Sequence, residues 1–216
     1  MALFRRTWIK FAAFSLILLV LYLGTRLTNL TKLPIFTDEA IYIRWSQIGS
    51  RDANWRFISL VDGKQPLFTW LMMAEMRLIK DPLLAGRLVS AGAGLLTMTG
   101  IWCLAYGLFR NRRISFLSSL IYLVSPFSLM YDRLALYDSL AAALAVWNIF
   151  MAILLVRRLR LDIALIYGMT LGLGMLNKTE GFLSLYLAPL VLVLFDWQEQ
   201  KKALSTRQKA QSFPWL

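Results

Sequence analysis

The chain has 216 residues, of which 58% are hydrophobic, and its formal net charge is +12. A soluble domain this apolar would be unusual, and the basic residues stand at the ends of apolar runs rather than along one soluble face, which argues against nucleic acid as a partner. A single cysteine excludes an intrachain disulfide, and the lack of histidine excludes imidazole catalysis and the usual His/Cys zinc sites.

Six apolar runs predict membrane-spanning helices. The first, residues 8–27, is interpreted as a retained span because it is long for a signal peptide and no clear cleavage site follows it. The others lie at about residues 83–109, 114–130, 134–156, 161–176 and 182–195. The predicted fold is therefore an all-α polytopic membrane protein with about six transmembrane helices.

Residues 28–81 form the predicted first extracytoplasmic loop, which contains two amphipathic stretches. Thr37 can N-cap a helix whose apolar face would be Ile41, Trp45 and Ile48, and Pro66 can open a second helix. Both are too short or too charged to span, so we expect them to lie in the membrane interface. In this interpretation residues 1–195 form the transmembrane domain, and residues 196–216 form a basic cytoplasmic tail.

Basic clusters predict the orientation, because cytoplasmic loops are rich in lysine and arginine. Every second loop is basic, with clusters at Arg5, Arg6 and Lys10, at Arg110, Arg112 and Arg113, at Arg157, Arg158 and Arg160, and at Lys201, Lys202, Arg207 and Lys209. The N-terminus is then cytoplasmic, and in a prokaryote the membrane would be the plasma (inner) membrane. We expect the charged residues of the three opposite loops to gather at the extracytoplasmic face: Asp38, Glu39, Asp62, Lys64, Asp132, Arg133, Asp138, Lys178 and Glu180.

Five motifs in order resemble those of one enzyme family. They are "TDEA" after the first run, "GKQPLFTW", "AGRLVSAGAGLLT", "SPFSLMYDRLALYDSL" and "GLGMLNKTEGFL". Together they are similar to the motifs of GT-C membrane glycosyltransferases of family 39, the protein O-mannosyltransferase and aminoarabinose-transferase type. Gln65 stands where that family usually has proline, and the chain resembles only the N-terminal half of such enzymes.

The resemblance implies transfer of a sugar from a polyprenyl-phosphate donor to a lipid, glycan or protein acceptor at the extracytoplasmic membrane face. It gives Asp38 the role of base, for which partial burial of a carboxylate is suitable, and it places Glu39 and Asp138 beside it as further catalytic carboxylates. Lys64, Arg133 and Lys178 are the implied partners of the leaving phosphate. No particular cofactor is indicated, although the carboxylates could hold a divalent cation.

Other interpretations stay open. Asp38 and Glu39 could be an acidic first helical turn, Lys178 and Glu180 could keep a short hairpin at the surface, and we expect Arg87 to be an interfacial anchor. The chain could also be a non-catalytic truncated homologue, or a transporter or assembly subunit. A transporter would place charges near the middle of the bilayer, whereas the predicted span interiors here are nearly free of charge.

Overall fold

The computed structural model describes residues 2–197, with side chains from residue 14 onward. All regular structure within this range is helical, which confirms the predicted all-α class. Two helices, α4 (Pro82–Phe109) and α7 (Tyr137–Arg158), are long and apolar enough to cross a membrane. They are candidate membrane spans by length and composition, while the count of six spans stays a prediction.

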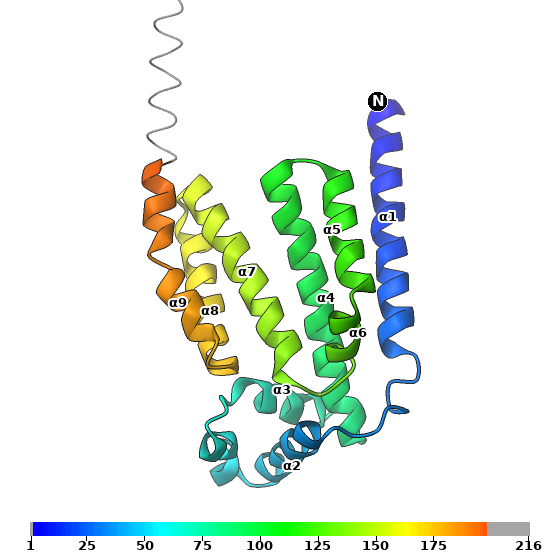
Figure 1. Ribbon diagram of the computed structural model, residues 1–216, viewed down its shortest axis with the longest axis vertical. Helices are drawn as coiled ribbons and strands as arrows, with labels where there is room; N and C mark the ends of the chain where they lie inside the picture. Colours follow the sequence, from blue (N-terminus) through cyan, green and yellow to red (C-terminus); the bar gives the residue numbers. More distant parts are fainter. Residues whose placement is uncertain (1, 198–216) are drawn as a thin grey trace, which may run out of the picture.

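The helices form a bundle that is closed at one end by shorter elements (Figure 1). Around α4 and α7 lie α1 (Ala2–Leu27), α5 (Arg112–Val124), α6 (Pro126–Tyr131), α8 (Leu161–Asn177) and α9 (Gly181–Leu187). Across one end lie α2 (Thr37–Arg51), η1 (Ala53–Trp55), η2 (Ile58–Asp62) and α3 (Leu67–Glu75). The α4–α5 and α7–α8 turns, which carry two of the basic clusters, lie at the opposite end (Figure 1).

Two predicted helices are interrupted at prolines. The expected helix 114–130 divides at Ser125, whose backbone is extended at φ −61° and ψ 127°, so that α5 ends and α6 begins at Pro126. The expected helix 182–195 is broken at residues 188–189, around Pro189, before helical structure resumes at residue 190. The ring of Pro126 disfavours helical backbone at Ser125. Ala188 keeps helical backbone at φ −55° and ψ −38°, and there the missing N–H of Pro189 interrupts the hydrogen bonds of the helix.

The predicted orientation of α2 is wrong. The N-cap is Phe36 and not Thr37, and the Glu39 carboxylate accepts a hydrogen bond from the Phe36 N–H at 3.2 Å. The face that is buried consists of Glu39, Tyr42, Ile43, Ser46 and Gly49, whereas Ile41 is 39% exposed. Glu39 forms a buried ion pair and therefore points toward the core. This sets the rotation of α2 about its axis, so that Tyr42 and Ile43 are buried and Ile41 is not.

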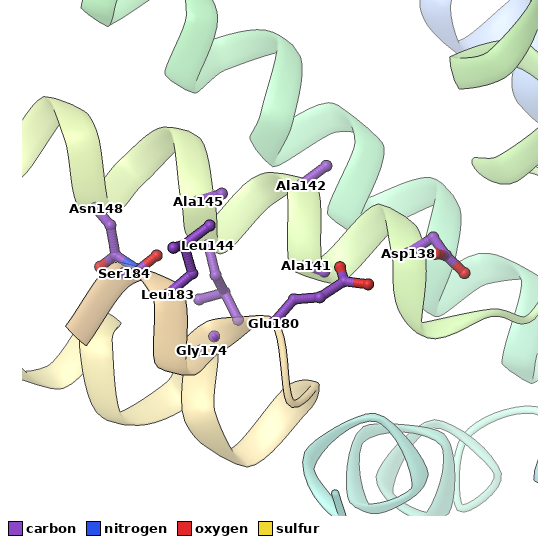
Figure 2. Close-up of a pocket in the computed structure, with 11 residues that line it drawn as sticks. Asp138, Ala141, Ala142, Leu144, Ala145, Asn148, Gly174, Glu180, Leu183 and Ser184 are labelled. Carbon is purple, nitrogen blue, oxygen red and sulfur yellow. The ribbon is translucent and has the colours of Figure 1, made fainter. Parts of the chain in front are cut away.

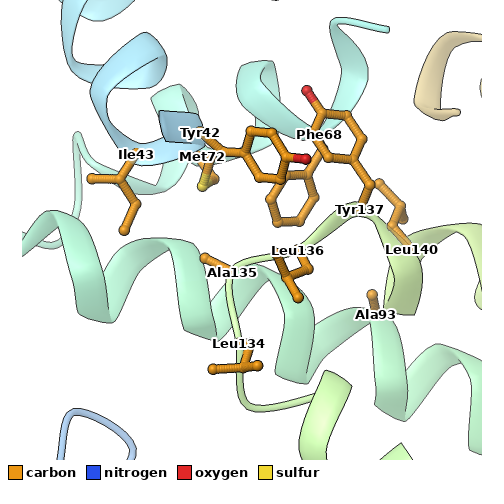
Figure 3. Close-up of a cluster of buried hydrophobic side chains, with 10 residues drawn as sticks. All are labelled: Tyr42, Ile43, Phe68, Met72, Ala93, Leu134, Ala135, Leu136, Tyr137 and Leu140. Carbon is orange, nitrogen blue, oxygen red and sulfur yellow. The ribbon is translucent and has the colours of Figure 1, made fainter. Parts of the chain in front are cut away.

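An aromatic and aliphatic cluster holds the closing elements against the bundle (Figure 3). Tyr42 from α2 and Phe68 from α3 both pack on Tyr137 at the start of α7, with ring centroids 4.8 and 4.9 Å apart. Phe68 and Met72 are completely buried, and full burial of such side chains stabilises the fold by about 1.5–3 kcal/mol each. The cluster therefore fixes α2 and the first turn of α7, which carry Asp38 and Asp138, relative to each other.

Candidate active site

Charged groups from α7 and the α8–α9 turn meet at the closed end of the bundle. The Lys178 Nζ lies 2.9 Å from Asp138 Oδ1 and 3.1 Å from Glu180 Oε1. Partial burial opposes the charge of Lys178, but its hydrogen bonds to the two carboxylates outweigh this effect, and its pKa is raised. Lys178 is therefore held protonated beside Asp138, and the structure brings together two of the residues predicted for the site.

Tyr42 connects this group to Asp38. Its hydroxyl has a pKa raised to about 12, chiefly by burial, with further increases from Asp38 and Asp138 and a decrease from Lys178. Charges influence one another in this way only over short distances at a protein surface. Asp38, Asp138 and Lys178 therefore lie within electrostatic reach of one hydroxyl, as does Asp62, although they come from separate segments of the chain. Tyr42 itself was not predicted as a site residue.

Asp38 is exposed, which corrects the partial burial expected for it. It lies in the first turn of α2, and the rotation of the helix that buries Glu39 leaves the preceding residue facing outward. A ligand that covered this end of the bundle would be needed to remove Asp38 from water.

A groove runs from Asp138 along α7 (Figure 2). It has a volume of about 460 Å³, and the α8–α9 hairpin forms its other wall. Asp138 lies at one end and Asn148 at the other, with Glu180 and Ser184 contributed by the hairpin (Figure 2). Asn148 is 4% exposed, and neither atom of its amide has a hydrogen-bond partner among the described residues. The groove thus combines apolar walls with a charged mouth and an unpaired amide.

Glu39 is fully engaged by the protein. Its carboxylate accepts two hydrogen bonds of 2.7 Å from the Arg87 guanidinium and one of 2.8 Å from the Ala135 N–H, in addition to that from Phe36. Burial raises the pKa of this carboxyl, but the hydrogen bonds from Arg87, Ala135 and Phe36 outweigh burial and lower it. The catalytic role of Glu39 stays a prediction. Its structural role is to pair with the buried Arg87 and to join α2 to α4.

Arg87 is completely buried, so its interpretation as an interfacial anchor is wrong. Besides the two bonds to Glu39, its guanidinium donates to the carbonyls of Leu30, Leu33 and Pro34 at 2.6, 3.1 and 3.2 Å. All five guanidinium N–H groups can thus be satisfied inside the protein, which removes any need to reach the lipid headgroups.

Lys64 and Arg133 make no contact with the group of Asp138, Lys178 and Glu180 among the hydrogen bonds and ion pairs of the described residues. Lys64 is exposed in the turn after η2. The Arg133 guanidinium donates to the carbonyls of Thr25, Thr28 and Asn29 at 2.8, 2.9 and 3.3 Å, and so caps the end of α1. No hydrogen bond joins either residue to Asp38, Asp138 or Lys178 in the described part of the chain, so their assignment to the leaving phosphate stays a prediction.

A second buried ionic group was missed by the sequence analysis. Asp132 is 1% exposed and accepts hydrogen bonds from Tyr122 at 2.9 Å and Ser139 at 3.0 Å, while the Arg26 Nε lies 3.4 Å away. Burial raises the pKa of the Asp132 carboxyl against the opposing effect of these partners. The sequence feature that could have indicated this group is Arg26, which lies in the last turn of an apolar run. A charged residue within such a run is usually paired with an opposite charge.

No group of three or more His, Cys, Asp or Glu side chains is placed to hold a metal ion among the described residues. Asp138 is paired with Lys178 and Glu39 with Arg87, so these two carboxylates already have cationic partners. A divalent cation held here would need oxygen ligands from a substrate in addition to protein groups, and its presence stays a prediction.

Comparison with known proteins gives one match. Residues 63–209, about two thirds of the chain, match the family described as dolichyl-phosphate-mannose-protein mannosyltransferase. No curated protein and no solved structure matches the chain. The matched range includes α4, α7 and the α8–α9 turn with Lys178, and it begins after α2.

Proposed function

Since the chain belongs to the dolichyl-phosphate-mannose-protein mannosyltransferase family, we propose that it transfers a sugar from a polyprenyl-phosphate donor to an acceptor hydroxyl at the membrane face. The acceptor would be a lipid, a glycan or a protein. The reaction would take place at the closed end of the bundle, which on the predicted topology faces away from the cytoplasm, and the bundle would be the N-terminal half of a GT-C arrangement.

In the proposed reaction the acceptor oxygen attacks the anomeric carbon of the donor sugar, and the bond from that carbon to the phosphate oxygen breaks. Asp38 takes the proton that the acceptor hydroxyl loses. A positioned carboxylate contributes typically about 10²–10⁴-fold to such a step. Because Asp38 is exposed, the bound donor and acceptor would have to exclude water from it.

The leaving group is a lipid phosphate, and it gains negative charge as the bond breaks. Lys178, held protonated at 2.9 Å from Asp138, is the cation best placed to stabilise that charge. Lys64 could approach the same region from its exposed turn. Asp138 would orient Lys178, and the donor's hydrocarbon tail could lie along the apolar walls of the adjoining groove.

One observation carries the proposal. Asp38 lies one helical turn before Tyr42 in α2, and the Tyr42 ring packs on that of Tyr137 with centroids 4.8 Å apart. Asp138 follows Tyr137 directly and holds the Lys178 Nζ of the α8–α9 turn at 2.9 Å. Two carboxylates and a cation gathered at one end of a membrane-type bundle provide a base and an anion stabiliser in the same place. A non-catalytic membrane protein has no need for that combination.

The test is transfer of labelled mannose from dolichyl-phosphate mannose by the full chain in proteoliposomes. Asp38→Asn should lower the rate by about 100-fold or more, because it removes the base while keeping size and polarity. Asp52→Asn is the matched control: Asp52 ends the same helix, and its side chain accepts a hydrogen bond from the Asn54 N–H, which an asparagine oxygen could also accept.

Asp52→Asn should transfer mannose at the rate of the unmodified chain. Transfer by Asp38→Asn at that same rate would refute the assignment of the base. If the unmodified chain transferred no sugar from this donor or from other polyprenyl-phosphate sugars, the proposed activity would be wrong for this chain, and a non-catalytic homologue would be the better description.

A further inference from the structure

A second pocket lies at the opposite end of the bundle, between α4 and α7. It has a volume of about 430 Å³ and contains three arginines, Arg110, Arg157 and Arg158. Figure 1 shows α4 and α7 diverging toward this end, where the α4–α5 and α7–α8 turns lie. The pocket is separate from the candidate active site, whose residues all lie at the closed end.

Two of the three arginines are free to bind a ligand. Arg157 donates a hydrogen bond to the Gly107 carbonyl and so ties α7 to α4. The guanidinium groups of Arg110 and Arg158 make no hydrogen bond or ion pair with any other side chain or carbonyl in residues 14–197. Arg110 ends α4 with its backbone in the left-handed conformation, at φ 53° and ψ 22°.

The rest of the pocket is apolar and lies along the two helices that can span a membrane. Trp102 and Tyr106 come from α4, and Phe150, Ile153 and Leu154 come from α7. Tyr106 and the arginines lie at the ends of these helices, where the headgroup zone of a bilayer would lie, and Trp102 and Phe150 lie about two turns deeper. A ligand of this pocket therefore has an anionic end beside the arginines and an apolar part that extends along the helices.

We propose that this pocket binds an anionic phospholipid. Its phosphate lies between Arg110 and Arg158, and its acyl chains pack on the apolar walls formed by α4 and α7. The charge of the arginines and the membrane position of the pocket support this occupant, since basic pockets between transmembrane helices bind anionic lipid headgroups. The lipid would bridge the ends of α4 and α7 beside the Arg157–Gly107 hydrogen bond, and so support their separation.

The proposal can be tested with the full chain purified in detergent and incubated with an equimolar mixture of phosphatidylglycerol and phosphatidylcholine. Native mass spectrometry then measures which lipid is retained. The unmodified chain should retain phosphatidylglycerol preferentially. Arg110→Asn/Arg158→Gln should reduce this preference by about 25-fold, because each basic residue near an anionic lipid contributes a factor of about five.

Asparagine is used at position 110 because it tolerates left-handed backbone, and Arg157 is kept so that its bond to Gly107 survives. The matched control is Arg113→Gln/Arg160→Gln, which removes two positive charges at the same end but outside the pocket. The control should keep the preference for phosphatidylglycerol. Equal loss in both variants would overturn the proposal, because the effect would then come from general surface charge.

A second measurement needs no arginine variant. Cys103 is the single cysteine of the chain and lines the same pocket, so the rate of its reaction with a maleimide reports on occupancy. The reaction should be slower in phosphatidylglycerol vesicles than in phosphatidylcholine vesicles. Equal rates would overturn the proposal, and slowing by free glycerol phosphate in phosphatidylcholine vesicles would assign the pocket to a soluble anion instead of a lipid.

Discussion

Glu39 and Arg87, 48 residues apart in the sequence, form a two-point ion pair in which both N–O distances are 2.7 Å and both side chains are completely buried. The pair joins the first turn of α2 to α4. Asp38 directly precedes Glu39, so the same pair fixes the helical turn on which the proposed base stands. The Glu39 side chain thus positions Asp38, whatever further part it takes in the reaction.

Breaking this pair should destabilise the fold. Glu39→Gln leaves Arg87 buried without a counter-charge, and loss of one partner of a buried pair costs about 3–5 kcal/mol. Thermal unfolding followed by circular dichroism in detergent would measure the change. Asp38→Asn is the matched control, because Asp38 is the residue next to Glu39 and its side chain is exposed. Similar melting temperatures for the two variants would contradict the structural role of the pair.

Stability should also depend on pH through Glu39. Its folded pKa lies below the ordinary value of 4.5 because of its hydrogen bonds to Arg87, Ala135 and Phe36. The stabilisation is therefore present above about pH 4.5 and is lost as the pH falls through the lowered folded pKa. Melting temperatures measured from neutral to strongly acid pH should fall only at the acid end. Glu39→Gln should flatten that decline, and an unchanged decline in this variant would assign it to other carboxylates.

Gly94 permits the buried contact between α1, α4 and Asp132. A Cβ atom at this position would lie 2.3 Å from both the Asp132 Cγ and the Tyr22 hydroxyl oxygen. Gly94→Ala should therefore displace the Asp132 network and destabilise the protein by about 1–3 kcal/mol, as overpacking of a well-packed core does. Gly92→Ala, on the same helix with open space at its Cβ position, should be neutral or slightly stabilising. Denaturant unfolding of the two variants compares them directly, and equal stabilities would mean that α1 or Asp132 can move aside freely.

Lys178 should matter more for transfer than for stability. Its side chain is 30% exposed and that of Asp138 is 42% exposed, and pairs this exposed contribute less than about 1 kcal/mol to stability. Lys178→Gln should lower mannose transfer by about 100-fold, the usual effect of removing one electrostatic stabiliser, with little change in melting temperature. Arg160→Gln removes the exposed pair with Asp162 at the other end of the bundle and should leave transfer unchanged. Full activity of Lys178→Gln would exclude it as the partner of the leaving phosphate.

The hydrophobic pattern was sufficient to predict the helical fold and the separation of a strongly basic end from the end at which most of the acidic residues gather. Apolar runs long enough to span a bilayer must satisfy their own backbone groups, which only helices do within a single segment. The predicted run 83–109 became α4 almost to the residue. The pattern failed where single residues decide the outcome: Pro126 divides one predicted helix, and the depth of Glu39 in the core sets the rotation of α2.

The site shows the same division. The sequence by itself determined that Asp38, Asp138 and Lys178 lie on loops of the same end, because loop order and charge follow from the succession of apolar runs. Only the tertiary structure decided which charges are available and which are already paired. In the sequence Glu39, Arg87 and Asp132 do not differ from the other charged residues. Burial of an unpaired charge is very costly, so in the folded protein each is held by partners from distant segments of the chain. Those partners decide what each residue can do.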